Sequence, residues 1–67
     1  MVTVNNKAIP YEPGMTVYTV LELCGYLGFG TLAVYINGIR VSSREGYRDV
    51  PVKELDRIQV IDFLGGG

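Results

Sequence analysis

The dipeptide Asn37-Gly38 constrains the fold of this chain more than any other feature of its sequence. It separates two runs of alternating apolar residues in the segment LAVYINGIRV. Asn-Gly favours a two-residue type I′ turn, because both central residues of that turn need a positive φ. The turn predicts an antiparallel hairpin whose register agrees with the alternation. On one face Ile36 lies opposite Ile39 and Val34 opposite Val41, and the other face carries Ala33, Tyr35 and Arg40.

A helix is predicted before this hairpin. One apolar stripe of about three turns follows the i, i+3, i+4, i+7, i+10 spacing of a helix face. Thr16 is a suitable N-cap, and Gly28 or Gly30 can supply the left-handed stop. Gly25 then falls in the last turn, where glycine costs about 1 kcal/mol relative to alanine. The stripe consists of Val17, Val20, Leu21, Cys24 and Leu27.

Strands are predicted at both ends of the chain. VTVNNKAIP is typical of a hairpin that turns at Asn5 and Asn6, with its register open because a strict two-residue loop would pair Val4 with Lys7. RIQVIDF, residues 57–63, predicts the final strand, after a polar surface loop over 42–52 and a turn over 53–56.

The order of these elements favours an α+β fold. Strand pair, helix, strand pair and final strand suit a mixed sheet of about four to five strands with one main helix packed across it. The economical solution is a β-grasp, in which the first and last strands lie parallel at the centre. We expect the β-grasp domain over residues 1–64 and a flexible glycine tail over 65–67.

Composition narrows the function classes open to a 67-residue chain. A hydrophobic content of 48% with 19% charged residues predicts one globular domain and no membrane span. The net charge of −1 argues against a nucleic-acid or anionic-membrane partner, because these require clustered basic residues. Cys24 cannot form an internal disulfide and the start MVTVNNK is no signal peptide, so we expect a cytoplasmic protein with Cys24 packed in the core.

The residue sets of an independent enzyme are missing from the sequence. It contains no histidine, no glycine-rich phosphate loop with a lysine and no metal-ligand cluster. We therefore expect no bound cofactor and no metal site. Four arginines are expected to be solvated surface charges, with contact to an acidic partner groove as the alternative: Arg40, Arg44, Arg48 and Arg57.

The final strand carries an apolar anomaly. Ile58 and Val60 share one face, so Ile61 and Phe63 fall on the opposite, solvent face, beside Tyr35. Contiguous exposed apolar area marks interaction sites, which predicts a partner-binding patch that leads into the glycines. Scattered surface hydrophobes, or a bulge that redirects the strand end, are the alternatives.

Five segments occur in one order along the whole chain: VTVNNK, TVYTVLELCGYLG, LAVYINGIRV, LDRIQVIDF and the terminal GGG. Together they resemble the ThiS and MoaD family of sulfur carriers, which are ubiquitin-like β-grasp proteins. AVYINGIRV and the short chain are most similar to ThiS members, the carriers for the thiazole of thiamine. Leu55 departs from the family pattern, where Gly usually precedes the Asp, and Ser42-Ser43 replace a Pro-Arg pair.

The resemblance implies a protein co-substrate rather than an enzyme. In such carriers a ThiF-type adenylyltransferase consumes ATP to adenylate the C-terminal carboxylate, here that of Gly67. Sulfur from a donor such as a cysteine desulfurase then displaces AMP and leaves a thiocarboxylate, which a ThiG-type thiazole synthase uses. Gly65 and Gly66 would thread into the partner's active site, because glycine avoids Cβ clashes.

The residues that follow the final strand suit this task. Leu64 to Gly67, if extended, reach at most about 13–14 Å. Leu64 joins Ile61, Phe63 and Tyr35 as a candidate contact that offsets the entropy of ordering the tail. Two alternatives stay open. One is the small subunit of molybdopterin synthase, which the short GFGT link disfavours. The other is a ubiquitin-like modifier or non-catalytic β-grasp interaction module.

Overall fold

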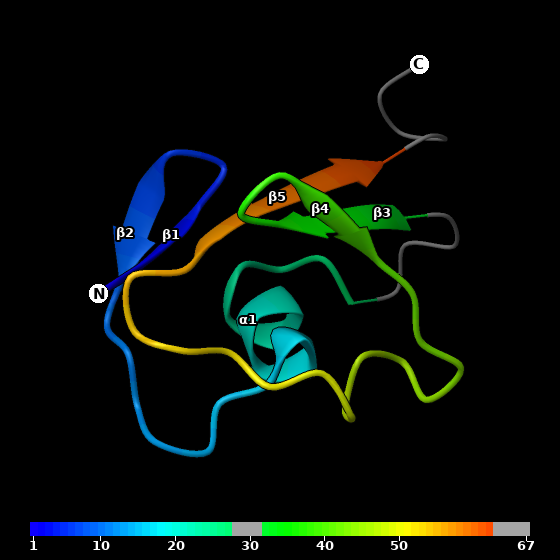
Figure 1. Ribbon diagram of the computed structural model, residues 1–67, viewed down its shortest axis with the longest axis horizontal. Coiled ribbons are helices and arrows are strands. Elements are labelled where there is room, and N and C mark those ends of the chain that lie inside the picture. Colours follow the sequence, from blue (N-terminus) through cyan, green and yellow to red (C-terminus); the bar gives the residue numbers. More distant parts are fainter. Residues whose placement is uncertain (28–31, 63–67) are drawn as a thin grey trace.

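In the part of the chain that the structure describes, five strands form one mixed sheet with one short helix packed against it (Figure 1). The computed structural model describes residues 1–27 and 32–62. Along the sheet the strand order is β2-β1-β5-β3-β4. The elements are β1 (Val2–Val4), β2 (Lys7–Ile9), α1 (Val17–Leu23), β3 (Leu32–Ile36), β4 (Ile39–Val41) and β5 (Arg57–Asp62).

The last strand occupies the centre of the sheet. β5 runs parallel to β1, with Thr3 opposite Arg57 and Val4 opposite Ile58, and antiparallel to β3 on its other side. Ile58 is 1% exposed, because it lies in the central strand on the face that α1 covers. This parallel contact between first and last strands, together with the helix across one face, confirms the predicted α+β β-grasp fold.

The N-terminal hairpin resolves the register that the sequence left open. Asn5 and Asn6 have φ values of 49° and 71°, so they form a two-residue turn of the left-handed kind. Val4 accordingly pairs with Lys7, and Val2 with Ile9. Lys7 tolerates a core-facing register because β2 is an edge strand, from which a long side chain reaches solvent.

The Asn37-Gly38 hairpin has the predicted register, with Val34 opposite Val41 and Ile36 opposite Ile39. Both turn residues have positive φ, 52° and 84°. Burial differs from expectation at two positions. Ile39 is 70% exposed because β4 is a three-residue edge strand that extends past the core. Ala33 lies on the outer face as predicted but is fully buried there, opposite Ile61.

The helix begins where predicted. Thr16 is its N-cap and forms a capping box with Thr19, whose backbone N–H donates to the Thr16 hydroxyl at 3.4 Å. Val17, Val20 and Leu21 bury the core-facing side.

The predicted helix length is wrong, because α1 spans seven residues rather than about three turns. Gly25, at φ 79°, is the left-handed stop in place of Gly28 or Gly30, both of which lie outside the described residues. Its N–H donates to Glu22 O at 3.3 Å, and the Tyr26 N–H donates to Leu21 O at 2.8 Å. This pair of bonds is a Schellman motif.

Two members of the predicted stripe consequently lie beyond the helix. Cys24 is the C-cap and packs, half-buried, against the core as expected. Leu27 is 42% exposed.

The segment over 42–56 contributes side chains to the core, although its composition predicted a polar surface loop followed by a turn. Val52 is buried, and Tyr47 and Val50 pack against the core. The Val17 N–H donates to Val50 O at 2.9 Å and the Val52 N–H to Met15 O at 3.0 Å, so this segment closes the core beside the helix N-terminus. In Figure 1 it passes in front of α1 as the yellow-green chain.

Candidate partner-docking site

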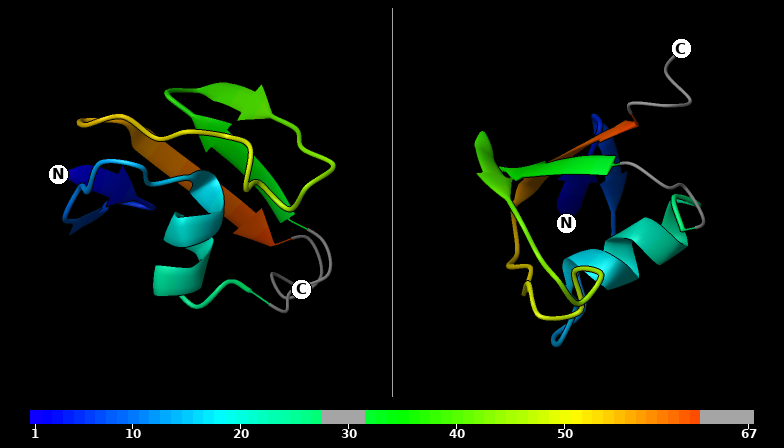
Figure 2. Two further views of the ribbon diagram at one scale, coloured as in Figure 1. Left: turned by 90° about the horizontal axis from the view of Figure 1, so that it is seen from below. Right: turned by 90° about the vertical axis from the view of Figure 1, so that its right-hand side faces the viewer.

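The face of the sheet opposite α1 is open, as the two turned views show (Figure 2). Strand alternation and the pairing registers assign eight residues to this outer face. Their side chains are small, polar, cationic or apolar, and none is acidic. They are Thr3, Ala8, Ala33, Tyr35, Arg40, Arg57, Gln59 and Ile61.

Ile61 and Tyr35 lie together on this face. Tyr35 pairs with Gln59, so Ile61, two residues further along β5, is its diagonal neighbour at about 7–8 Å. Ile61 is 44% exposed and Tyr35 is half-buried. The predicted alternation of β5 is therefore confirmed at Ile61, which rules out a bulge before the strand ends at Asp62. Phe63 and Leu64, with Gly65 to Gly67, lie outside the described residues.

Asn5 holds β5 from the β1 side. Its backbone N–H donates to Ile58 O at 2.9 Å. Its side chain then pairs with Val60: Oδ1 accepts from the Val60 N–H at 2.9 Å, and Nδ2 donates to Val60 O at 3.1 Å. The chain turns toward β2 at this point, so the carboxamide continues the ladder that a longer β1 would have made.

The same carboxamide links the sheet to the end of the helix. Asn5 Nδ2 also donates to the Tyr26 hydroxyl at 2.8 Å. Tyr26 is the last residue of the Schellman motif that ends α1. The Asn5 side chain therefore joins the first hairpin, the helix C-terminus and the second half of β5.

Asn37 makes a corresponding contact from the β3 side. Its Oδ1 accepts from the Arg57 N–H at 2.9 Å, and its backbone N–H donates to Arg57 O at 2.7 Å. Its Nδ2 donates to the carboxylate of Asp56 at 3.1 Å. Asp56 is 9% exposed and also accepts from the Lys53 N–H at 2.8 Å, which satisfies both of its oxygens.

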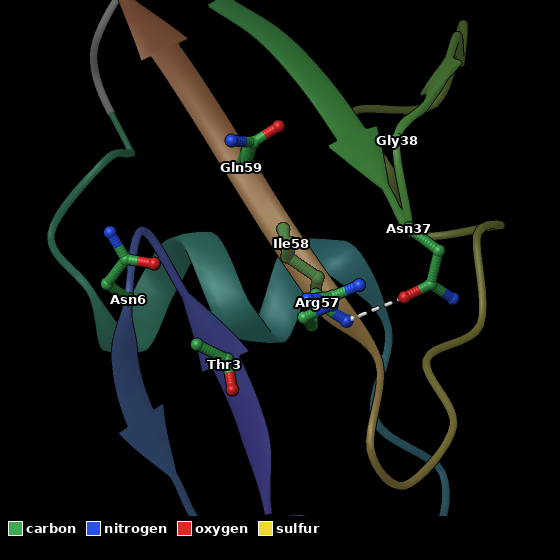
Figure 3. Close-up of a pocket in the computed structure, with 7 residues that line it drawn as sticks. All are labelled: Thr3, Asn6, Asn37, Gly38, Arg57, Ile58 and Gln59. Carbon is green, nitrogen blue, oxygen red and sulfur yellow. Dashed lines mark hydrogen bonds between the residues drawn. The ribbon is translucent and has the colours of Figure 1, made fainter.

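A shallow groove of about 310 Å³ lies on the outer face where β5 begins. Arg57 lies within it, between the turn of the first hairpin and the turn of the second (Figure 3). Backbone and side chains of seven residues line it: Thr3, Asn6, Asn37, Gly38, Arg57, Ile58 and Gln59.

Sequence reasoning missed both this groove and the two asparagine contacts with β5. A sequence signal for the asparagines exists, since Asn rather than Gly stands first in each two-residue turn. Glycine would meet the φ requirement without a side chain, whereas Asn adds a carboxamide that can bond a neighbouring strand. The groove has no comparable signal, because its lining comes from three segments distant in sequence.

The described residues offer an open surface rather than an enclosed site. Across residues 1–27 and 32–62 no group of three or more His, Cys, Asp or Glu side chains could hold a metal ion. Within the same ranges no helix is long and apolar enough to cross a membrane. What these residues offer is an open sheet face, with an apolar pair near the end of β5 and a polar, cationic groove near its start.

The parallel central strands, the crossing helix and the open outer face define a ubiquitin-like β-grasp domain. The sequence model of the ThiS family matches residues 2–67, and the chain belongs to that family. Members of the family are small sulfur carriers rather than catalysts, and they act with sulfur-transfer enzymes. Comparison with curated proteins and with solved structures gave no match.

Proposed function

We propose that this protein carries sulfur for thiazole formation in thiamine biosynthesis, as a thiocarboxylate on Gly67. The observation that carries the proposal is the match to the ThiS family, which extends through the terminal glycines to residue 67. The described residues add a scaffold suited to a carrier, since the open sheet face and β5 lead directly to residues 63–67.

The chemistry requires activation by a partner. A terminal carboxyl group is ionised at neutral pH, so it can attack the α-phosphate of ATP and release pyrophosphate. The resulting acyl adenylate is an electrophile that the carboxylate itself is not. The terminal sulfur of a persulfide displaces AMP from it to form an acyl disulfide. A second thiol then attacks the S–S bond, which releases the thiocarboxylate and leaves a disulfide on the donor. We assign adenylation to a ThiF-type enzyme that consumes ATP, sulfur donation to a cysteine desulfurase, and sulfur use to a ThiG-type thiazole synthase.

We assign partner binding to Ile61, Tyr35, Phe63 and Leu64. The exposure of Ile61 beside Tyr35 supports this assignment, because the two side chains are diagonal neighbours on the outer face, and Ile61 lies two residues before residue 63. Gly65 and Gly66 are assigned to the narrow part of the partner's site, where side chains would clash. Together these residues would bring the Gly67 carboxylate to bound ATP.

Intact mass spectrometry tests the proposal. The protein is incubated with a ThiF-type enzyme, ATP, a cysteine desulfurase and cysteine. We expect one terminal oxygen to be replaced by sulfur, and we expect no change when ATP is omitted or when a variant lacking residues 65–67 is used. Failure of the intact protein to form either adenylate or thiocarboxylate would contradict the proposal.

A second reaction distinguishes the thiamine pathway from the molybdopterin pathway. The purified thiocarboxylate is offered separately to a thiazole synthase and to the large subunit of molybdopterin synthase, each with its remaining substrates. Sulfur transfer to the thiazole product supports the proposal. Transfer only in the presence of the molybdopterin synthase subunit overturns the thiamine assignment in favour of a MoaD-like role.

A further inference from the structure

The outer sheet face has a charge opposite in sign to that of the whole protein. Its eight residues include two cations, Arg40 and Arg57, and no carboxylate, whereas the chain has a net charge of −1. Every Asp and Glu of the chain therefore lies elsewhere: Glu12, Glu22, Glu45, Asp49, Glu54, Asp56 and Asp62. Such segregation of charge favours encounter with an acidic surface.

Arg57 has no anionic partner within the part of the chain that the structure describes. The ion pair found there joins the Met1 amino group to Glu54 at 3.4 Å. Asp56, its sequence neighbour, is directed away to the Asn37 amide and the Lys53 N–H. The guanidinium of Arg57 is thus exposed and available.

The other three arginines of the chain do not lie in the groove around Arg57. Arg48 stacks over the Tyr18 ring, 4.1 Å from its centroid, and donates to Glu45 O at 3.4 Å. Arg44 is exposed in the loop over 42–56, three residues after β4 ends. Arg40 pairs with Tyr35, which pairs in turn with Gln59, so Arg40 lies on the same face as Arg57 with one strand, β3, between them.

The groove around Arg57 has the chemistry of a carboxylate site. Its other lining side chains are uncharged. Those of Thr3, Asn6 and Gln59 are hydroxyl and amide groups that can donate hydrogen bonds, while the Asn37 amide is bonded to Asp56. A planar guanidinium binds a carboxylate through two parallel N–H···O bonds. A single cation in an open groove is too little charge for a polyphosphate or a nucleic-acid backbone, which need several basic residues.

We propose that the outer face docks an acidic surface of the enzyme that activates the tail, and that an Asp or Glu side chain of that enzyme enters the groove at Arg57. Arg57 and Ile61 are four residues apart on β5, or about 13 Å. One partner surface can therefore contact the groove and the apolar pair of Ile61 and Tyr35 together. The groove then determines partner choice and the apolar pair excludes water near the tail. This inference rests on the proposed function for the identity of the enzyme.

Charge reversal tests the role of the groove in the enzyme complex. Adenylation by a ThiF-type enzyme is measured as ATP-dependent release of pyrophosphate at varied carrier concentration for Arg57→Glu, Arg40→Glu and the matched loop control Arg44→Glu. We expect KM for the carrier to rise about tenfold for Arg57→Glu and less for Arg40→Glu, with kcat unchanged, since like charges across an interface weaken binding. The control should match wild type. An Arg57→Glu KM equal to that of Arg44→Glu would overturn the proposal.

A titration on the protein alone separates this inference from the proposed function. Amide chemical shifts are followed by NMR at low salt as capped tetraglutamate is added, with capped tetraglutamine as the neutral probe. We expect tetraglutamate to shift the amides of Gly38, Arg57 and Gln59, and we expect the double variant Arg40→Glu/Arg57→Glu to lose these shifts while its spectrum stays dispersed. Equal shifts with the neutral probe, or shifts elsewhere only, would disprove an acid-binding face even if adenylation proceeds. If adenylation fails but the shifts appear, the outer face binds acidic groups and the proposed sulfur-carrier function is wrong.

Discussion

Leu55 occupies a backbone conformation that suits glycine. Its φ is 72°, and its side chain is 79% exposed in the turn before Asp56. A left-handed conformation costs an ordinary L-residue roughly 1–2 kcal/mol, and Leu55 recovers little of this by burial. Leu55 is therefore locally strained, within a turn that is closed by the hydrogen bond from the Asp56 N–H to Lys53 O at 3.2 Å.

Replacement of this residue by glycine should stabilise the protein. Leu55→Gly removes the left-handed penalty but adds conformational entropy to the unfolded chain, which offsets about 0.5–1 kcal/mol of the gain. We expect the free energy of unfolding to rise by about 0.5 kcal/mol, measured by urea denaturation. Leu23→Gly is the contrasting variant, because Leu23 is similarly exposed but helical, and it should lower stability by about 1 kcal/mol.

At Ile61 a substitution should affect binding without affecting the fold. Ile61→Asp places a charge on a side chain that is 44% exposed, so the thermal unfolding midpoint should change little. KM for adenylation should rise about tenfold or more, because docking would bury an unpaired charge. Ile39→Asp, at a site 70% exposed on the edge strand, is the control and should leave KM unchanged. Unimpaired adenylation of Ile61→Asp would remove Ile61 from the docking surface.

At the scale of the elements, both hairpins also hold the central strand β5 in place through their turns. Each turn begins with an asparagine whose side chain bonds the backbone of β5, Asn5 at Val60 and Asn37 at Arg57. Because the two contacts come from opposite sides of β5, the strand is held at its first residue and again in its second half by side chains that lie outside the ladder.

Glycine substitutions in the first turn separate this contact from the turn conformation itself. Asn5→Gly keeps the positive φ but loses the bonds to Val60 and Tyr26, so we expect a loss of about 1–3 kcal/mol. Hydrogen exchange at the Val60 amide should accelerate. Asn6→Gly keeps φ equally well and loses no side-chain hydrogen bond to a described residue, so it should stay within about 0.5 kcal/mol of wild type. Equal effects of the two variants would show that the carboxamide does not hold β5.

The short helix limits what the sequence alone could predict. The stripe from Val17 to Leu27 continues the helical spacing past Gly25, and periodicity carries no information about where φ changes sign. The helix ends at Gly25 because the two hydrogen bonds of the Schellman motif satisfy carbonyl groups of the last helical turn. By contrast, the Asn37-Gly38 turn determined its register locally, so that hairpin could be predicted pair by pair.

At the scale of the whole molecule, stability depends on a strand that is last in sequence and central in space. Ile58 is among the largest fully buried side chains and lies opposite both Val4 and Ile36. Its burial joins the two hairpins and α1 into one core. A domain of this size is expected to have a total stability of only about 3–10 kcal/mol.

Truncation at this position should therefore affect the entire fold. Ile58→Ala should cost about 2–5 kcal/mol through lost burial and an unfilled cavity. We expect near-UV circular dichroism and chemical denaturation to show a largely unfolded population at 37 °C. Ile39→Ala removes the same atoms from an exposed site and should cost less than about 0.5 kcal/mol. A cooperative transition near the wild-type midpoint for Ile58→Ala would show that the two hairpins are stable independently.

The overall architecture could be predicted because element order, apolar alternation and one strong turn all favoured the same β-grasp. The outer face could be predicted in part, since alternation alone places Ile61 and Tyr35 there. The groove at Arg57 could not, because it depends on two turns and a strand start that meet only in the folded sheet. The role of Val50 and Val52 in the core was hidden by the polar residues around them.

The parallel arrangement of β1 and β5 has a mechanical consequence. A pull on the end of β5, as when an enzyme draws in the residues that follow it, acts along the strand and across its hydrogen bonds. The bonds from Thr3 to Asp56, from Asn5 to Ile58 and from the Asn5 side chain to Val60 then carry the load in shear and must lengthen together. An antiparallel partner joined by a turn could be unzipped one bond at a time. We therefore expect the domain to stay folded while an enzyme pulls on the residues that follow β5.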